Sequence, residues 1–398
     1  MGSQRDKLAV IVARMGPYHV AKLAALARAY GAEHVVALEV ASSDTTYDWD
    51  PVSAAGFRRV TLIRDASYEA AGALRRAREI TAALEREAPD AVGVNGWAFP
   101  EARAALRWCR RNRRIAVLMS DSQAHDRRRF FLKEWVKSAI VRQFDSALVP
   151  GPRHERYVRS LGLPGSAIAY GYDVVDNEHF LVGAESARKD TNARKKLGLP
   201  VRYFLTVARF IPEKNLPTFL LSYAVYRRLC GEDAWHLVLL GDGSSREYLR
   251  RLSMNIGISA YVHMPGFQQY AVLPAYYGLA SAFVLPSISE PWGLVVNEAM
   301  ASGLPVLVSK SCGSVQLVKE GINGWSFDPT SSDEIASAML RVTRLGPDLD
   351  AFSSASKRII ADFTPEIFAR GFLKAVELGR RSSRRHHLSR IAARIPGW

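Results

Sequence analysis

One stretch, residues 289–308, constrains the fold of this chain more than any other. It opens after an apolar run at 282–285 and closes into a second apolar run at 306–308. Apolar runs of this length are typical of buried strands. Gly303 stands where a helix ends in a left-handed residue, and the proline that soon follows prevents its continuation. The stretch therefore predicts a strand, a loop, a helix that begins near Gly293, and another strand.

A helix that begins there favours an anionic ligand at its N-terminus. The first backbone N–H groups, those of Gly293, Leu294 and Val295, lack acceptors within the helix, and the helix dipole is positive at that end. The carboxylates of Glu290 and Glu298 cannot bind a phosphate, so we expect them to accept hydrogen bonds from hydroxyls. A phosphate between hydroxyl groups indicates a sugar nucleotide. The alternative is an ordinary strand–helix unit with solvated glutamates.

The same stretch resembles the signature of the retaining glycosyltransferases of family 4. That signature places two glutamates inside E-P-F/W-G-L-x-x-x-E-A-M-A-x-G-x-P-V, and this chain reads E-P-W-G-L-V-V-N-E-A-M-A-S-G-L-P-V from Glu290 onwards. The resemblance implies an α/β protein with the GT-B fold, in which two Rossmann-like, doubly wound domains face a cleft. It also implies that Glu298 binds ribose hydroxyls, at a partly exposed position, and that Glu290 binds hydroxyls of the sugar.

Length and composition fit a globular protein of more than one domain. The chain has 398 residues, 23% charged and 48% hydrophobic, and the prior for this length is about two to three domains. Three widely spaced cysteines, Cys109, Cys230 and Cys312, form neither a metal-ligand pattern nor an even disulfide framework. No apolar run reaches the roughly eighteen residues of a membrane span. We therefore expect a cytoplasmic protein.

The net charge of +15 and the pI near 9.8 favour anionic partners: nucleic acid, a membrane surface or small anionic molecules. Nucleic acid is not the partner we expect, because few aromatic residues interleave the basic clusters and the paired glutamates would stay unexplained. A dinucleotide-dependent oxidoreductase would need Gly-x-Gly-x-x-Gly after the first strand, and residues 13–16 read Ala-Arg-Met-Gly.

Apolar strands alternate with helical stretches through the first half of the chain. The predicted strands are 7–13, 33–40, 57–63, 91–95, 115–120 and 146–149, and the predicted helices include 20–30, 68–87 and 100–111. This alternation is typical of a parallel, doubly wound sheet, which binds ligands at the carboxyl ends of its strands.

Those strand ends carry the candidate acceptor site. The family resemblance implies that the loop with Gly16 contacts the donor phosphate, and that His19 and Trp97 lie on the acceptor side. In the family, the fifth strand leads into a histidine that faces the reacting sugar, whereas this chain has Asp121 there. We assign Asp121 a catalytic, acceptor-side role, with His125 or His19 as compensating residues. Alternatively, Asp121 caps the helix that follows.

The second half repeats the alternation. The segment 170–180 resembles the family's N/D-x-x-x-F junction, and the polar residues 184–196 indicate a linker. We place an acceptor-side domain at 1–175, a nucleotide-sugar-binding domain at 176–375, and a basic tail at 376–398 that returns to the first domain.

Arg209 and Lys214 follow a strand predicted at 203–207, where they could grip a diphosphate. They match the family's R-x-x-x-E-K-N phosphate clamp. The resemblance further implies that the glycine turn at Gly241 lies at the donor site, that the main chain near Phe267 meets the base, and that residues 310–316 close over the donor.

The resemblance implies the transfer of a hexosyl group, with retention, from a UDP- or GDP-sugar to an acceptor hydroxyl, and we expect this transfer to be metal-independent. The acceptor would be a glycan, a lipid-linked molecule or a small molecule of bacterial polysaccharide, glycolipid or glycoside biosynthesis. A 2-epimerase and a phosphorylase of the same fold are the alternatives. Asp-x-Asp pairs at 48–50 and 348–350 do not follow apolar strands, and Arg209 and Lys214 already supply positive charge, so we expect no metal and no cofactor.

The tail from 380 to 398 combines many arginines with Leu388, Ile391, Ile395 and Trp398. This composition is typical of an interfacial anchor on an anionic membrane, here the inner face of the cell membrane. The alternative is that the apolar residues pack on the first domain while the arginines stay in water.

Overall fold

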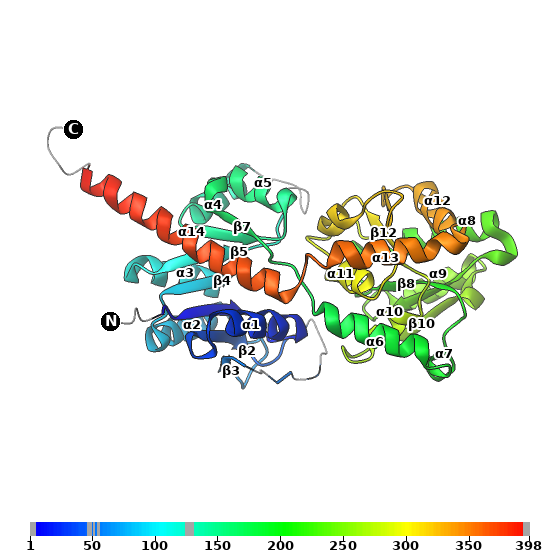
Figure 1. Cartoon of the computed structure of the whole chain (residues 1–398), viewed down its shortest axis with the longest axis horizontal. Coiled ribbons are helices and arrows are strands. Elements are labelled where there is room, and N and C mark those ends of the chain that lie inside the picture. The colour runs from blue at the N-terminus through cyan, green and yellow to red at the C-terminus, as the bar shows by residue number, and fades with distance from the viewer. Residues whose placement is uncertain (1–4, 46–49, 51, 54–55, 124–130, 393–398) are drawn as a thin grey trace. The chain divides into compact units, whose positions relative to one another are not determined.

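The computed structural model describes residues 5–45, 50, 52–53, 56–123 and 131–392, with side chains left out at 131–132 and 383–392. The described residues form two compact units (Figure 1). The first contains the residues up to 123, those from 131 to 174, and those from 365 onwards. The second contains residues 175–364. Each unit is built on its own parallel sheet.

The described strands of the first unit form a seven-stranded sheet in the order β3-β2-β1-β4-β5-β6-β7. The strands are β1 (Leu8–Val12), β2 (Val35–Ala41), β3 (Arg58–Ile63), β4 (Ala91–Asn95), β5 (Ile115–Met119), β6 (Ser146–Val149) and β7 (Ile168–Tyr170). All pairings are parallel, and β1 pairs with both β2 and β4. The strand order reverses between β1 and β4, which is where doubly wound sheets bind ligands.

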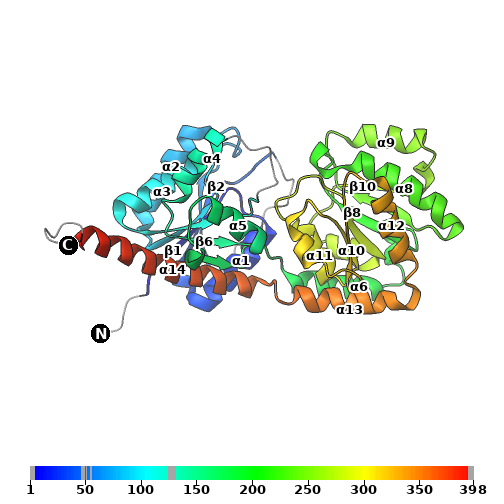
Figure 2. The ribbon, with the colours of Figure 1, turned by 90° about the horizontal axis from the view of Figure 1, so that it is seen from above.

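Helices cover both faces of this sheet (Figure 2). They are α1 (Pro17–Tyr30), α2 (Ala73–Glu87), α3 (Pro100–Asn112), α4 (Phe131–Val141), α5 (Pro152–Ser160) and α14 (Pro365–Ala392), with the 3-10 turns η1 (Ala32–His34) and η2 (Gly165–Ala167). Side chains of a strand alternate between faces. Ala9 and Ile11 therefore join the core beneath α2 and α3, whereas Val10 and Val12 face α1 and α14.

Helix α14 begins at Pro365 and packs on α1 and on strands β5, β6 and β7. The packing is close because glycines stand at the contacts: a Cβ at Gly371 would lie 2.0 Å from the Tyr170 carbonyl oxygen, and one at Gly93 would lie 2.7 Å from Phe372. Residues 365–375, expected in the second domain, therefore lie with the first unit. Phe368, Phe372, Ala375 and Val376, which recur at helical spacing, are buried on this side of the helix.

The described strands of the second unit form a six-stranded parallel sheet in the order β10-β9-β8-β11-β12-β13. The strands are β8 (Tyr203–Val207), β9 (His236–Leu240), β10 (Val262–Gly266), β11 (Ala282–Leu285), β12 (Val306–Ser309) and β13 (Gly324–Phe327). The helices are α6 (Asn177–Lys189), α7 (Ala193–Leu197), α8 (Leu216–Cys230), α9 (Arg246–Asn255), α10 (Leu273–Leu279), α11 (Leu294–Ala301), α12 (Ser332–Thr343) and α13 (Leu349–Ile360). The 3-10 turns are η3 (Pro212–Lys214), η4 (Gly231–Asp233), η5 (Ser259–Tyr261), η6 (Gly313–Leu317) and η7 (Gly346–Asp348).

The predicted strand, loop, helix and strand around residue 290 are confirmed as β11, α11 and β12. Helix α11 starts one residue after Gly293, whose φ is 102°, and Gly303 follows its end with a φ of 77°. Both angles lie in the left-handed region that glycine tolerates.

The linker predicted at 184–196 is wrong, because most of these residues belong to α6 and α7. The side chain of Asp176 caps α6 by accepting a hydrogen bond from the His179 backbone N–H at 3.1 Å. Phe180, Ala184 and Ala187 are buried on one side of the helix, which packs on α10. Polar composition concealed this amphipathic pattern.

Two further observations bear on the sequence expectations. Cys109, Cys230 and Cys312 are all free thiols. None of the helices in the described part of the chain is both long and apolar enough to cross a lipid bilayer.

Candidate functional site

In the second unit, the loops after β8 and β9 are joined by main-chain hydrogen bonds. The Phe210 N–H donates to the Asp242 carbonyl at 2.7 Å, and the Ser245 N–H donates to the Phe210 carbonyl at 3.0 Å. Gly241, with a φ of 132°, makes this approach possible, because a Cβ there would lie 2.0 Å from the Ala208 carbonyl oxygen. The exposed Arg209 is carried on this paired backbone.

The loops after β11 and β12 are joined in the same way. The Gly313 N–H donates to the Glu290 carbonyl at 3.0 Å, and the Ser314 N–H donates to the Trp292 carbonyl at 2.9 Å. The Trp292 ring is buried, and its Nε1 donates to Asn297 Oδ1 at 2.9 Å. The loop that carries Glu290 is therefore fixed on one side by the loop beyond β12 and on the other by α11.

Lys214 and Glu290 meet at this edge of the sheet. The Lys214 ammonium forms an ion pair with the Glu290 carboxylate, and the two side chains are 16% and 13% exposed. Ser287 Oγ also lies 3.4 Å from the same carboxylate oxygen. Sequence analysis assigned Lys214 to the diphosphate and Glu290 to the sugar, and the structure brings the two together.

The first turn of α11 lies beside this ion pair in the fold. Leu294 and Val295 are the first two residues of the helix, so their N–H groups have no acceptor within it. A Cβ at Gly293 would lie 3.1 Å from the Ser314 hydroxyl and 3.3 Å from Glu290 Cγ. The buried Ser314 Oγ has no hydrogen-bond partner among the described residues. Hydrogen-bond donors thus gather where the sequence predicted an anion.

Glu298 is fully buried, so the expected partly exposed position is wrong. Its Oε2 accepts a hydrogen bond of 2.6 Å from Tyr277 Oη, and Tyr277 is also fully buried. The Tyr277 ring packs edge-on against Phe180, with centroids 5.7 Å apart. The carboxylate is buried because α10 and α6 pack over this side of α11. Tyr277 was missed because an aromatic residue in a short helix carries no distinguishing pattern.

Asn215 is a second residue that sequence analysis missed. It adopts a left-handed φ of 56° at the start of α8, which asparagine tolerates better than most residues. Its Nδ2 donates to the carbonyls of Pro286 and Pro329, at 3.2 and 2.8 Å. Asn215 thereby ties three loops of this edge together. The sequence signal that could have identified Asn215 is its position directly after Lys214.

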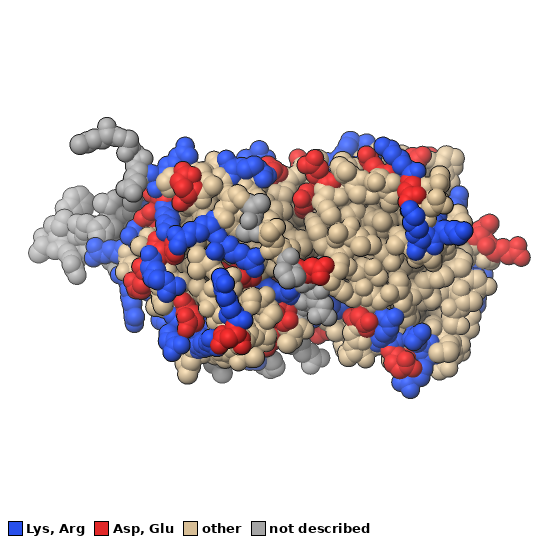
Figure 3. Space-filling view, turned by 90° about the horizontal axis from the view of Figure 1, so that it is seen from below, with Lys and Arg blue, Asp and Glu red and all other residues tan. Residues whose placement is uncertain are grey.

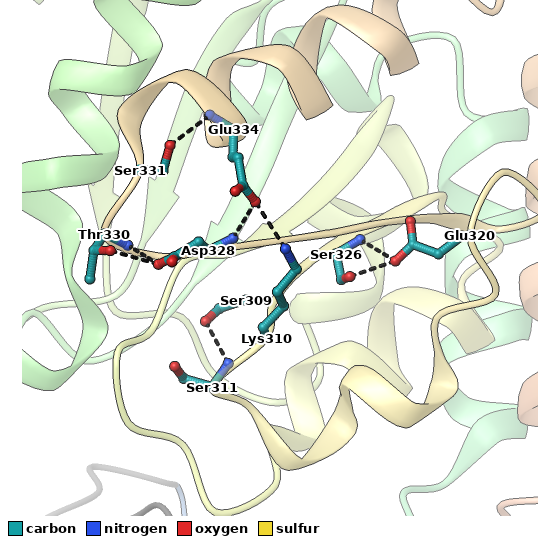
Figure 4. A network of polar contacts seen from close by, with 9 residues as sticks. All are labelled: Ser309, Lys310, Ser311, Glu320, Ser326, Asp328, Thr330, Ser331 and Glu334. Carbon is teal, nitrogen blue, oxygen red and sulfur yellow. Dashed lines mark hydrogen bonds and ion pairs between the residues drawn. The ribbon is translucent and has the colours of Figure 1, made fainter.

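The segment predicted to close over the donor, residues 310–316, is anchored at its beginning (Figure 4). Lys310 Nζ donates to Glu334 Oε2 at 3.0 Å, and the same oxygen accepts the Asp328 N–H at 2.8 Å. The Glu334 N–H in turn donates to Ser331 Oγ at 3.2 Å, which caps α12. Phe267, expected near the base, follows β10 and is 38% exposed.

In the first unit, His19 lies in the first turn of α1. Its Nδ1 accepts a hydrogen bond from the Gly16 N–H at 3.2 Å, so the two residues predicted from the first loop contact each other. Burial, and then the nearby Lys22 ammonium, lower the pKa of His19 to about 3. His19 is therefore a neutral imidazole at physiological pH.

Lys22 is a buried lysine that sequence analysis missed. It is 6% exposed, and its Nζ lies 4.8 Å from the centre of the Tyr172 ring and 5.3 Å from that of Phe368. Burial lowers the pKa of Lys22, while Asp173 and Asp121 oppose that effect. Its position on a mainly apolar helix gave no signal of a charged site.

A small hollow brings these groups together at the carboxyl ends of β1, β4 and β5. It is lined by Val10, Val12, His19, Lys22, Leu23, Asn95, Met119, Tyr172 and Phe368. Tyr172 Oη donates to Asn95 Oδ1 at 2.9 Å. Burial raises the pKa of Tyr172 well above its ordinary value, with Asp121 and Asp173 adding to the effect. Asn95 and Tyr172 thus join His19 as polar groups at the predicted edge.

The remaining acceptor-side residues are placed differently. Asp121 is half-buried and follows β5, but the residues directly after it are not helical, so it does not cap a helix and that alternative is wrong. Trp97 is 6% exposed and packs edge-on against Tyr157 in the core, with ring centroids 6.0 Å apart. His125 lies outside the described residues.

Surface charge in the first unit is of both signs (Figure 3), and the described residues hold no cluster of metal ligands. On the face shown in Figure 3, the Lys and Arg side chains of the first unit are interspersed with acidic ones. The described residues contain no group of three or more His, Cys, Asp or Glu side chains that could hold a metal ion. The Asp348–Asp350 pair spans the junction of η7 and α13, away from any strand end, and the pair at 48–50 lies mainly outside the described residues.

Comparison with known proteins adds to this geometry. Residues 189–359 match the family described as glycosyl transferases group 1. Over 191 residues the chain is 29% identical to a GDP-mannose-dependent alpha-(1-6)-phosphatidylinositol monomannoside mannosyltransferase of Mycobacterium tuberculosis, a match that covers 46% of this chain and 48% of that protein. The chain spans about half or less of the length of the curated relatives it matches first.

Solved structures with a similar fold align with nearly the whole chain. Sucrose-phosphate synthase from Thermosynechococcus elongatus has a TM-score of 0.75 at 20% identity, covering 95% of this chain and 99% of that one. Anabaena HepE in complex with UDP and glucose has a TM-score of 0.73 at 16% identity, covering 94% and 100%. The two Rossmann-like units are therefore those of the GT-B fold, and the region 189–359, which carries Lys214, Glu290 and Glu298, belongs to the glycosyl transferases group 1.

Proposed function

We propose that the chain is a retaining glycosyltransferase that moves a hexosyl group from a UDP- or GDP-sugar to an acceptor hydroxyl. The observation that carries the proposal is the meeting of Lys214 and Glu290 beside the first turn of α11. A cation, a carboxylate and unpaired helix N–H groups recognise a diphosphate joined to a polyhydroxylated sugar. The group 1 family of this region and the fold of the neighbours support the proposal.

In this proposal, Lys214, Arg209 and the N–H groups of Leu294 and Val295 stabilise the charge that grows on the leaving diphosphate. That charge is larger in the transition state than in the bound donor, so these groups act on kcat more than on KM. The Lys214–Glu290 ion pair would open when the donor binds, with Lys214 turning to the phosphate. Glu290 would then accept hydrogen bonds from sugar hydroxyls.

The main chain around Gly241, Gly293 and Phe267 completes the proposed donor site, and Glu298 receives the ribose hydroxyls. Because Glu298 is buried beside Tyr277, ribose would approach a carboxylate that the Tyr277 hydroxyl already orients. The acceptor would bind to the first unit at Gly16, His19 and Asp121. Because Nδ1 accepts the Gly16 N–H, the neutral His19 carries its proton on Nε2 and can donate a hydrogen bond to the acceptor, while the Asp121 carboxylate can align the attacking hydroxyl.

Two other reactions share the fold, and product analysis separates them. With labelled UDP- and GDP-sugars and a panel of glycan, lipid and small-molecule acceptors, we expect label in a new glycoside whose anomeric configuration equals that of the donor. A 2-epimerase would release an altered free sugar or nucleotide sugar without an acceptor, and a phosphorylase would require inorganic phosphate. Either product, or an inverted glycoside, would contradict the proposal.

We also propose that the reaction needs no metal, because Arg209, Lys214 and the helix N-terminus provide positive charge at the diphosphate. Turnover should persist when the enzyme is assayed in excess EDTA. Loss of turnover with EDTA, restored by Mn²⁺, would overturn this part of the proposal. The control is a metal-dependent glycosyltransferase assayed in the same buffer.

Membrane attachment through residues 380–398 stays a separate proposal. Among the described side chains, Arg380 pairs with Asp6 and Arg381 with Glu377, both within the first unit. The side chains of Leu388 and Ile391, and the whole of Ile395 and Trp398, lie outside the described residues. We expect salt-sensitive sedimentation with anionic vesicles that a truncation after Gly379 abolishes. Sedimentation unchanged by the truncation would assign the tail a structural role.

A further inference from the structure

A second hollow in the first unit lies at the carboxyl ends of β2 and β3, at the edge of the sheet. It is lined by Ser42, Arg59, Thr61 and Arg64. Arg59 and Thr61 belong to β3 and point to the same side, whereas Ser42 and Arg64 directly follow their strands. The Ser42 N–H donates to the Ile63 carbonyl at 3.0 Å, which holds the two strand ends together. Among the described residues, the lining contains two guanidinium groups, two hydroxyls and no carboxylate.

Arg59 is held in position by a buried carboxylate. Its Nε donates to Glu39 Oε2 at 3.0 Å and its Nη2 to Glu39 Oε1 at 2.8 Å, while Nη1 donates to the Val52 carbonyl at 2.7 Å. Glu39 is fully buried, and the Arg59 side chain is 24% exposed. A guanidinium has five N–H donors, so these bonds leave part of its donor capacity for the hollow. Because the Arg59 guanidinium is already held in place, less side-chain entropy is lost when a ligand binds to it.

The charges of the hollow do not cancel. Glu39 balances Arg59, and Thr61 Oγ1 also donates to Glu39 Oε2 at 2.6 Å. Arg64 is exposed and forms no ion pair with any described residue. Asp44, a carboxylate that follows β2, forms an ion pair with Arg14 at 3.7 Å. An uncompensated arginine therefore stands beside a fixed one.

The same carboxylate connects this hollow to the first loop of the unit. The Met15 N–H donates to Glu39 Oε1 at 2.7 Å, and Met15 directly precedes Gly16, which we assign to the acceptor side. The guanidinium of Arg59 and the backbone of the first loop are thus fixed by one buried group. The hollow and the first loop therefore share one buried anchor, Glu39.

We propose that this hollow binds an anionic group of the acceptor, a phosphate or a carboxylate. An anion offers only acceptors, which matches the guanidinium donors and the Ser42 hydroxyl of the lining, and charge-assisted bonds to arginine are the strong ones. This inference rests on the proposed function, since it assigns the substrate class of the same enzyme. It goes beyond that function because it predicts a negatively charged acceptor.

The first test is binding of inorganic phosphate, which needs no turnover. The full chain with Lys214→Met serves as the reference, so that phosphate binds less tightly to the proposed donor site. By calorimetry, we expect phosphate to bind to this reference and Arg64→Gln to weaken binding roughly tenfold. Arg78→Gln is the matched control, because Arg78 is an exposed arginine of the same unit, paired with Glu79 on α2. Equal affinity in the Arg64 and Arg78 variants, or no phosphate binding, would overturn the inference.

The second test separates phosphate from carboxylate. With the unmodified chain, sugar phosphates and uronic acids are compared with neutral sugars as acceptors, at saturating donor. We expect one anionic class to have the lower KM, and Arg64→Gln to raise that KM roughly tenfold while leaving donor release without acceptor unchanged. Equal KM values for neutral and anionic acceptors would contradict the inference but leave the proposed glycosyl transfer intact. Failure of donor turnover with every acceptor would instead count against the proposed function.

Discussion

The carboxyl-end edges of the two sheets hold their polar side chains in different ways. In the second unit, Lys214 and Glu290 stand on loops that main-chain hydrogen bonds fasten to one another. In the first unit, Lys22 is 6% exposed and lies between the Tyr172 and Phe368 rings, inside the packing of α1 and α14. A side chain on a surface loop can be replaced with little loss of stability, whereas replacing a side chain of a buried cluster changes activity and stability together. The following predictions test this difference, beginning with the largest effect.

Replacing Lys214 should affect catalysis far more than folding. Lys214→Met removes the cation that, in the proposed function, stabilises the leaving diphosphate, so we expect kcat to fall roughly a hundredfold or more. The free energy of unfolding should change by less than about 1 kcal/mol, because the Lys214–Glu290 pair is partly exposed and lies on loops. Steady-state kinetics and urea unfolding measure the two quantities.

Lys310→Met is the matched control for this experiment. Lys310 follows β12 at the same edge but pairs with Glu334 on α12, and both side chains are about half exposed. We expect its kcat to stay within about threefold of the unmodified value, because its ammonium is held by Glu334 away from the proposed diphosphate. A rise in KM alone for Lys214→Met would contradict the catalytic role.

Substitution of Gly241 should destabilise the paired loops after β8 and β9. Gly241→Ala would place a Cβ 2.0 Å from the Ala208 carbonyl oxygen at a φ of 132°, and we expect a loss of at least about 3 kcal/mol in unfolding free energy. Gly257→Ala is the control: its φ of 73° is also left-handed, but no atom lies within 4 Å of the added Cβ. There we expect a loss of about 1 kcal/mol. Equal losses would show that the close approach of the two loops does not matter.

We expect the burial of His19 in the first unit to make the free energy of unfolding depend on pH. His19 has a pKa of about 3 in the folded chain and an ordinary value of 6.5, so between these values the unfolded state binds more protons. Stability therefore falls as the pH is lowered through this window, by up to about 1.4 kcal/mol for each pH unit.

Urea unfolding at pH 6.5 and pH 4.5 tests this, with His19→Gln as the comparison. Glutamine keeps a polar side chain but does not titrate, so the variant should lose up to about 2.5 kcal/mol less than the unmodified chain between the two pH values. Parallel stability curves would show that His19 is not buried as a neutral group. Other titrating groups contribute equally to both proteins and cancel in the difference.

Sequence reasoning succeeded where a local rule decides the structure. Helix α11 was predicted from the glycines at its two ends, and strands β4 and β6 were predicted from their apolar runs. These predictions succeeded because turn conformation and strand burial depend on residues nearby in the sequence. It failed at 184–196, where polar composition concealed the buried face of α6. It also failed for Lys22, because a lysine on a helix is ordinarily solvated. Only α14, which returns from the far end of the chain, places the Phe368 ring beside Lys22.

The smallest predicted effect concerns Tyr277, whose buried hydroxyl contacts Glu298 of the proposed donor site. Tyr277→Phe removes the 2.6 Å hydrogen bond to Glu298 but keeps the ring against Phe180. We expect a loss of about 1 kcal/mol in unfolding free energy and a fewfold weaker affinity for the nucleoside diphosphate, because the carboxylate loses the donor that orients it. Glu298→Ala should weaken nucleotide binding further and, since it removes the carboxylate that accepts from the Tyr277 hydroxyl in the core, also lower stability by about 1 to 3 kcal/mol. Calorimetric titration with UDP and GDP, beside urea unfolding of both variants, measures these changes. If Glu298→Ala unfolds more easily yet binds nucleotide as before, Glu298 is a core residue and ribose is recognised elsewhere.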